Sequence, residues 1–322
     1  MDLTKIFKLE SKDRVLILYD AADDMGSTWI WRIGFADLLR TDLSKICFTR
    51  LGTYRATGAN NADLPLTIFL DGQPAAIEDV MKDSTVVIAL TEYSATAPLK
   101  AFGKKYGIRA ASMPGFSEKM LAALEVDYDL LGKKVSEKYE RLKKSKSVDI
   151  VFQALQKEYF MHFDLRNRVP KKDDGVCTEK GCVINLPSGE AFIVPNEEDS
   201  KTEGYLPIER EGKVNIFKVE QNKIVSSLFP DELMDKIKED PAVGNIAELA
   251  FGVLSDFGIK PCGRTLLDEK LGLHIALGRS EHLGGTTSPS SFRKKENVWH
   301  QDYVYIKEMQ PSIIIKKINF LG

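Results

Sequence analysis

The chain has 322 residues, a formal net charge of −2 at pH 7, 43% hydrophobic residues and 29% charged residues, which is ordinary for a globular protein. Its length suits two domains or one large domain. The near-neutral charge excludes a broad basic field for nucleic acid. No apolar run approaches the roughly 20 residues that cross a bilayer. The charged N-terminus lacks the apolar region of a signal peptide, so we expect a cytoplasmic protein without membrane partners.

Strands and helices alternate in the first half. In chain order the pattern predicts a strand at 14–20, a helix at 27–40 with Ser27 as its N-cap, a strand at 84–93, a helix at 97–107 closed by Gly107 and a strand at 108–116. This alternation indicates an α/β domain, a parallel sheet with flanking helices. The loop AADDMGS at 21–27 matches neither glycine-rich phosphate-binding motif, so we do not expect a nucleotide site there.

An amphipathic helix is predicted at 127–145, and we place the domain boundary after residue 147. Residues 148–322 have the pattern of an α+β domain that is mainly antiparallel. Its predicted strands are EYFMHFDLR, GCVINLP, EAFIVP, GYLPI, KVNIFKV, KIVSSLF, LHIALG and VWHQDYVYIK.

Two of the four cysteines, Cys177 and Cys182, flank the tetrapeptide TEKG. This spacing fits a hairpin disulfide or half of a zinc site. No second close pair supplies the other two thiolates, and disulfides are rare in the cytosol. We therefore favour ordinary thiols.

Three of the four histidines lie between residues 274 and 300. In the predicted strand WHQDYVYIK, His300 and Asp302 point to the same face with Val304 and Ile306. An imidazole and a carboxylate on an apolar face are costly to desolvate unless a cation compensates them. A metal ion or a structural His–Asp hydrogen bond would explain the pair equally well.

Glu248 lies in a segment, 240–258, that is apolar nearly all round. With Asp240 as N-cap and Pro241 at the first helical position, this segment is predicted to be a buried helix. A buried carboxylate is protonated, paired with lysine or arginine, or bound to a metal ion. His274, in the apolar run LHIALG, is ambiguous in the same way, because a lone core histidine is usually hydrogen-bonded.

Four segments in order resemble the aminopeptidase T family of dinuclear metallopeptidases, the thermophilic leucyl aminopeptidases. They are LPSGEAFIVPNEEDSKTEGY, NIAELAFG, LLDEKLGLHIALG and WHQD, and the resemblance covers about residues 145–305. It implies a homodimer that binds two zinc or cobalt ions, with Asp302 or a glutamate as a bridging ligand. The metal ligands that it implies are Glu190, Glu248, Glu269, His274, His300 and Asp302.

The family tyrosine that is thought to stabilise the tetrahedral intermediate is replaced here by Glu281, and His282 follows it. The resemblance implies an aminopeptidase in which Glu248 or Glu269 acts as the general base on a metal-activated water. His282 would then replace the tyrosine as electrophile. The substrate would be a peptide or another small molecule.

A second reading is a ring-cleaving dioxygenase of the dihydroxypyridine branch of the same fold family. One iron(II) would be held by His274 or His282 together with His300 and Asp302, since two histidines and one carboxylate suit non-haem iron. The retained glutamates favour two metals, and the lost tyrosine favours iron. A third reading is a relative that binds metal without turnover.

Overall fold

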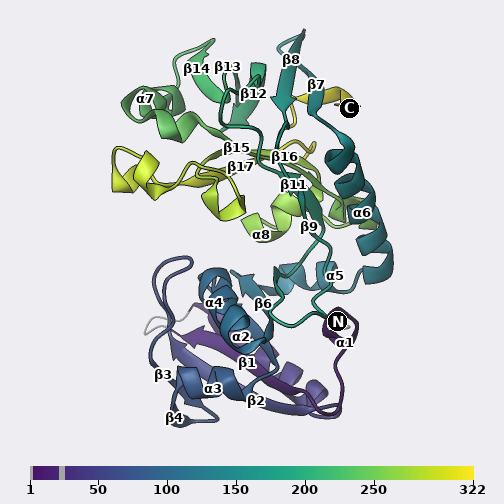
Figure 1. Ribbon diagram of the computed structural model, residues 1–322, viewed down its shortest axis with the longest axis vertical. Helices are drawn as coiled ribbons and strands as arrows, with labels where there is room; N and C mark the ends of the chain where they lie inside the picture. The colour runs from purple at the N-terminus through teal and green to yellow at the C-terminus, as the bar shows by residue number, and fades with distance from the viewer. Residues whose placement is uncertain (1–2, 22–25) are drawn as a thin grey trace. The chain divides into compact units, whose positions relative to one another are not determined.

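The computed structural model describes residues 3–21 and 26–322 (Figure 1). Part of the loop that lacks a phosphate-binding motif, residues 22–25, lies outside the described residues. The chain forms two compact units, one of residues 1–132 and 173–188 and the other of residues 133–172 and 189–322. The predicted boundary after residue 147 falls inside the second unit, which begins at residue 133, and the chain later returns to the first unit for one further strand.

The first unit contains a seven-stranded sheet of order β10-β6-β5-β1-β2-β3-β4. Its strands are β1 (Arg14–Ala21), β2 (Phe48–Arg55), β3 (Thr67–Leu70), β4 (Gln73–Ala76), β5 (Val86–Thr91), β6 (Arg109–Pro114) and β10 (Val183–Asn185). Its five strands from β10 to β2 are parallel, and β1, β5 and β6 are the strands predicted for a parallel sheet, whereas β2 was not predicted. Strands β3 and β4 are antiparallel at one edge. The sheet is therefore mixed.

Two features of this sheet differ from the sequence prediction. Strands β3 and β4 form a hairpin whose turn, Asp71-Gly72, has two positive φ angles of 49° and 84°, and Asp-Gly is a strong signal for such a turn. The predicted strand GCVINLP, which we assigned to the second domain, forms β10 beside β6.

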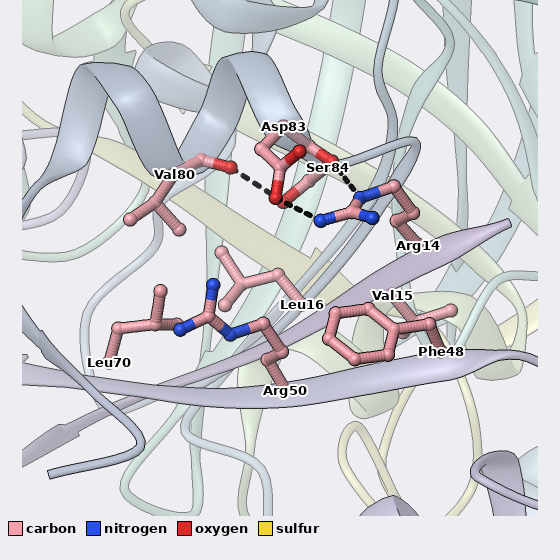
Figure 2. Close-up of a pocket in the computed structure, with 9 residues that line it drawn as sticks. All are labelled: Arg14, Val15, Leu16, Phe48, Arg50, Leu70, Val80, Asp83 and Ser84. Carbon is pink, nitrogen blue, oxygen red and sulfur yellow. Dashed lines mark hydrogen bonds and ion pairs between the residues drawn. The ribbon is translucent and has the colours of Figure 1, made fainter.

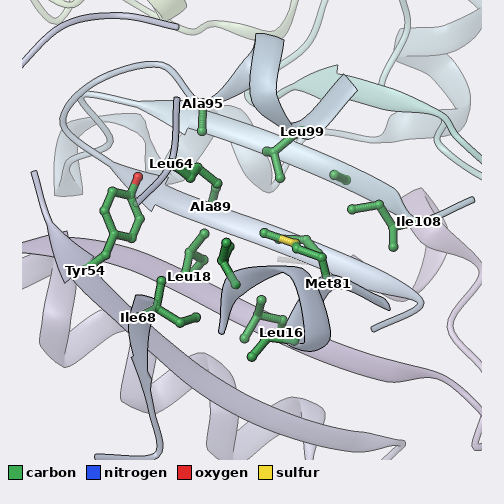
Figure 3. Close-up of a cluster of buried hydrophobic side chains, with 14 of the residues drawn as sticks. Leu16, Leu18, Tyr54, Leu64, Ile68, Met81, Ala89, Ala95, Leu99 and Ile108 are labelled. Carbon is green, nitrogen blue, oxygen red and sulfur yellow. The ribbon is translucent and has the colours of Figure 1, made fainter. Parts of the chain in front are cut away.

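Helices cover the sheet through apolar side chains. Figure 3 shows Leu16 and Leu18 of β1 and Ala89 of β5 in one buried cluster with Met81 and Leu99, which lie on α3 and α4. The helices of this unit are α1 (Leu3–Phe7), α2 (Ser27–Leu43), α3 (Ile77–Asp83), α4 (Thr96–Tyr106) and α5 (Leu121–Leu124).

Helix ends follow local backbone chemistry. Helix α4 ends at Gly107, which has a φ of 72° as a left-handed C-cap requires. Helix α2 begins at Ser27 as predicted, but its N-cap is Gly26 rather than Ser27. Helix α6 (Tyr128–Lys144) forms where it is predicted. Among the described residues, no helix combines the length and the apolar character that crossing a membrane would need.

The second unit contains two antiparallel sheets, as predicted. The six-stranded sheet has the order β14-β13-β12-β8-β7-β18 and the five-stranded sheet the order β17-β16-β15-β11-β9. The first consists of β7 (Ser147–Ala154), β8 (Lys157–Asp164), β12 (Glu203–Arg210), β13 (Lys213–Glu220), β14 (Lys223–Ser227) and β18 (Ile314–Leu321). The second consists of β9 (Lys171–Asp173), β11 (Glu190–Ile193), β15 (Ile246–Gly252), β16 (Leu273–Gly278) and β17 (His300–Val304).

The prediction of a helix at 240–258 is wrong. Pro241–Gly244 forms a short 3-10 helix, η2, and the next seven residues form the central strand β15. A central strand that is buried on both faces has no period of two, so its sequence looks like that of a buried helix. The other helices described in this unit, besides most of α6, are α7 (Glu232–Glu239), α8 (Thr265–Asp268) and the 3-10 helices η3 (Leu254–Phe257), η4 (Glu269–Leu271), η5 (Glu281–Leu283), η6 (Pro289–Ser291) and η7 (Lys295–Asn297).

Candidate metal centre

Three neighbouring strands of the five-stranded sheet place two carboxylates in one row. Glu248 of β15 lies opposite Ala276 of β16, and Ala276 lies opposite Asp302 of β17. Directly opposite residues in a sheet project to the same face. The small side chain of Ala276 therefore leaves room between the two carboxylates.

Both predicted histidines project to that face. His274 lies two residues before Ala276, and His300 lies two residues before Asp302 and opposite Gly278. Side chains two residues apart in a strand share a face. Glu248, which was predicted on a helix but lies on a strand, thus still joins the predicted histidines and Asp302 in one site.

Glu190 joins the same face from β11. It is the first residue of that strand and lies opposite Gly252 of β15. A Cβ atom on Gly252 would lie 2.2 Å from the carbonyl carbon of Lys270 in η4. Glycine at this position therefore allows η4 to lie directly on the sheet beside Glu190.

These residues form two groups of potential metal ligands that share Glu248. The first is Glu190, Glu248 and His274, and the second is Glu248, His300 and Asp302; within each group the ligand atoms lie within 4.8 Å of one another. Five of the six predicted ligands are thus brought together.

The orientation of the two histidine rings suits a metal site. Nδ1 of His300 lies 2.7 Å from the carbonyl oxygen of Arg279, and Nδ1 of His274 lies 3.4 Å from that of Gly272. A carbonyl can only accept, so both Nδ1 atoms donate. Metal-binding histidines commonly use their other nitrogen in this way.

Both Nε2 atoms then face carboxylates. Nε2 of His300 lies 3.2 Å from Glu248 Oε2 and 3.5 Å from Asp302 Oδ1. Nε2 of His274 lies 3.4 Å from Glu190 Oε2 and 3.9 Å from Glu248 Oε1. A nitrogen lone pair that faces a carboxylate is repelled by it, so each Nε2 atom needs a proton or a metal ion.

Lys270 is a residue of this site that the sequence reading missed. Its side chain is 1% exposed, and Nζ lies 3.0 Å from Glu190 Oε1 and 2.5 Å from Glu269 Oε1. The ion pairs of Glu248 and Asp302 in the described chain are instead with histidines. In the sequence, Lys270 follows Asp268 and Glu269, and three adjacent charged residues usually lie at the surface. Only the leucines on either side of this run indicate burial.

Glu269, the sixth predicted ligand, lies outside both groups of potential ligands. It is in η4, before β16 begins, and its carboxylate accepts a hydrogen bond from Lys270. Glu190 keeps one buried oxygen, Oε2, that accepts no hydrogen bond from the described residues. That unsatisfied oxygen faces His274, as an oxygen at a cation site would.

Burial shifts the pKa values of the carboxylates. Burial raises the pKa of Glu248, although the hydrogen bond with His300 opposes the rise. Burial also raises the pKa of Glu269 to about 8, against the charge of Lys270. For Asp302 the effect of burial is outweighed by the hydrogen bond with His300, and the pKa is lowered to about 2.

The histidine pKa values respond to the same charges. Burial would lower the pKa of His274 and His300, but the surrounding carboxylates outweigh it and raise both, that of His300 well above its ordinary value. The pKa of His282 falls to about 4, because partial burial and the nearby charge of His300 disfavour its imidazolium form.

His282 lies at the edge of the site, in η5, outside both groups of potential ligands. Its ring contacts the ring of His300 edge-on, with centroids 5.0 Å apart. Glu281, at the place of the family tyrosine, pairs with Arg279. The loop is held by Glu197, whose Oε1 accepts hydrogen bonds from Ser280 and Thr287.

Two pockets in the described chain are lined by none of these potential ligands. Figure 2 shows one in the first unit with a volume of about 10 Å³, room for about one water molecule. Its arginines are already paired, Arg14 with Asp83 and Arg50 with Asp71. In the second unit, a pocket of about 330 Å³ is lined by polar residues and by none of the predicted ligands.

The fourth histidine and the cysteine pair do not join the centre. His162 pairs with Asp149 in the six-stranded sheet at 2.6 Å. Cys177 and Cys182 are thiols, as favoured, and Cys177 Sγ lies 3.2 Å from the carbonyl oxygen of Cys182.

Comparison with known proteins finds the fold in two enzymes. No family model and no curated protein matches the sequence. The structure of 2,5-dihydroxypyridine dioxygenase from Pseudomonas putida KT2440 matches with a TM-score of 0.61 and 16% identity, covering 92% of this chain and 88% of that chain. Wild-type AmpT from Thermus thermophilus matches with a TM-score of 0.58 and 14% identity, covering 99% and 92%. At these identities the similarity establishes a shared fold.

Proposed function

We propose that the chain is a metal-dependent aminopeptidase that hydrolyses the first peptide bond of a substrate with a free amino group. The observation that carries this proposal is the position of Glu248. Its carboxylate lies between the two histidine Nε2 atoms, and each group of potential ligands contains one histidine and two carboxylates. A dioxygenase centre would instead need two histidines on one iron ion.

The residues fit a divalent ion because buried carboxylates and imidazole nitrogens converge within ligand distance of one another. Glu190, Glu248, Glu269 and Asp302 supply four carboxylates, and Lys270 supplies one ammonium group. An ion held by Glu248 and its neighbours would polarise a carbonyl and lower the pKa of a water molecule. We expect zinc or cobalt, as the resemblance implies.

The protein's own residues would move and hold protons. Glu248, beside the ion, would accept the proton of the attacking water and pass it to the leaving amine. The backbone carbonyls of Arg279 and Gly272 keep Nδ1 of each histidine protonated, so that each Nε2 lone pair stays directed to the centre. Glu269 pairs with Lys270, which disfavours its predicted role as general base.

The test is hydrolysis by chelator-treated protein after zinc or cobalt is restored. We expect release of p-nitroaniline from amino-acid p-nitroanilides and none from their N-acetylated forms. Glu248→Gln should lower kcat by about 100-fold or more, as loss of a general base does. Equal hydrolysis of the acetylated substrates, or hydrolysis that ignores the metal, would contradict the proposal.

The second candidate is an iron dioxygenase, and one observation favours it. The edge-on contact of His282 with His300 brings a second imidazole to the side of the His300–Asp302 pair. Oxygen uptake with iron(II) and 2,5-dihydroxypyridine, without hydrolysis of any p-nitroanilide, would support this candidate. A chain that binds metal but turns over neither substrate would match the non-catalytic reading.

The proposal also includes a cytoplasmic homodimer that acts on peptides or other small molecules and binds neither nucleic acid nor membranes. Light scattering coupled to gel filtration tests the dimer directly. A monomer at micromolar concentration would exclude this part of the proposal and leave the metal chemistry unaffected.

A further inference from the structure

The buried ammonium of Lys270 is held by two carboxylates that the family resemblance implies to be metal ligands. Glu190 and Glu269, which hold it, are two of the six implied metal ligands. A lysine side chain is almost never fully buried unless it is paired. The two carboxylates therefore already have a cation from the protein itself.

We infer that Lys270 takes the place of one of the two metal ions, so that the chain binds a single divalent ion at Glu248, His300 and Asp302. This inference rests on the metal centre of the proposed function and sets its stoichiometry. It also gives Glu190 and Glu269 a role in a chain that binds one ion, because both pair with Lys270.

The two groups of potential ligands differ in how Lys270 affects them. The first group contains Glu190, whose Oε1 is 3.0 Å from the lysine Nζ. An ion held by Glu190 would lie close to the ammonium, and two cations repel strongly in a buried site. The ion pairs of the second group are with histidines, and Lys270 reaches it only through its charge on Asp302, without a direct ion pair among the described contacts.

Lys270 cannot easily leave this position. Its backbone lies so close to β15 that a Cβ atom on Gly252 would meet its carbonyl carbon at 2.2 Å and its carbonyl oxygen at 2.3 Å. The side chain is buried along its length. Any move of the ammonium to admit a second ion would leave a buried charge without partners.

The experiment measures metal stoichiometry. Chelator-treated protein is equilibrated with excess zinc, desalted, and analysed for zinc per chain by mass spectrometry of the metal. We expect one ion in the wild type and two in Lys270→Met, which keeps the length of the side chain and removes its charge. The matched control is Lys134→Met, because Lys134 pairs with Asp256 at the surface of the same unit and should leave the content at one.

A second variant keeps the test decisive if Lys270→Met does not fold. Glu190→Gln should leave the zinc content at one ion per chain, since Glu190 pairs with Lys270 and does not bind the ion. If the wild type bound two ions, the same substitution would lower the zinc content from two to one. Two ions in the wild type, or no gain in a folded Lys270→Met, would overturn the inference. A wild-type protein that binds no zinc would contradict the proposed function. The difference in zinc content between Lys270→Met and the wild type tests the role of Lys270 alone.

Discussion

The orientation of single rings is the residue-scale feature that makes this site suited to a cation. Each histidine donates Nδ1 to a backbone carbonyl and turns Nε2 toward carboxylates. A histidine that served only as a core hydrogen-bond donor would have no need to face two acids. The arrangement predicts that each carboxylate of the second group contributes directly to metal affinity.

Asp302→Asn should therefore weaken zinc binding. We expect a loss larger than the roughly 10–100-fold that removal of an outer partner of a metal ligand causes, because Asp302 would itself contact the ion. Isothermal titration with zinc measures the change. Asp149→Asn is the matched control, since Asp149 also pairs with a histidine, His162, but lies outside the ligand groups. Equal effects of the two substitutions would contradict the assignment.

The ion-free protein should show a pH-dependent contribution from His300. Its folded-state pKa is raised well above the ordinary value of 6.5. A group with a raised folded pKa stabilises the fold fully below its unfolded pKa and loses this effect as pH rises through its folded pKa. With chelator present, the Tm difference between wild type and His300→Gln should thus be largest near pH 6 and shrink toward alkaline pH. A constant difference across this range would show that the imidazolium contributes nothing.

Sequence reasoning identified the acids and histidines of the site but missed the lysine. The motifs that carried Glu248 and His274 are apolar strands interrupted by one polar residue, which is a visible anomaly. Lys270 lies in the charged run Asp-Glu-Lys, where a surface position is the ordinary expectation. Its burial depends on the close approach of η4 to β15, a tertiary contact that no local pattern encodes.

At the scale of elements, the parallel strands β1, β5 and β6 and the helices α2, α4 and α6 could be predicted, and the central strand β15 could not. All but the last residue of β15 is buried, because the strand has neighbours on both sides and is covered on both faces. Its sequence therefore lacks alternation. Strands β7 and β18 were also missed, although the burial of β7 alternates along its length and its sequence, SVDIVFQA, contains that period.

The contact between β15 and η4 predicts a strong effect of a single methyl group. In Gly252→Ala the new Cβ atom would clash with the backbone of Lys270, and we expect a loss of about 1–3 kcal/mol in the free energy of unfolding from overpacking. Urea denaturation measures it. Gly34→Ala on α2 is the control: beyond the helix's own backbone, no atom lies within 4 Å of the place its methyl group would take, so this helical substitution should stabilise by about 0.5–1 kcal/mol. A neutral Gly252→Ala would mean that η4 moves away at little cost.

At the scale of the whole molecule, the chain does not divide at one point. Residues 173–188 return to the first unit, where β10 extends the parallel sheet beside β6. Most of α6 belongs to the second unit although its first residues belong to the first. The predicted boundary after residue 147 relied on a change of pattern along the sequence, and such a change cannot reveal a strand that is added from a later segment.

A split at the predicted boundary should therefore give two incomplete fragments. Fragment 1–147 would lack β10 and leave the buried edge of β6 without its hydrogen-bonding partner, an exposed edge that favours aggregation. It would also contain helix α6, most of which belongs to the second unit. We expect neither 1–147 nor 148–322 to unfold cooperatively when purified alone, and co-expression to restore a soluble complex with the circular dichroism spectrum of the intact chain. A cooperative thermal transition of isolated 1–147 would show instead that the first domain folds without its last strand, as a division after residue 147 implies.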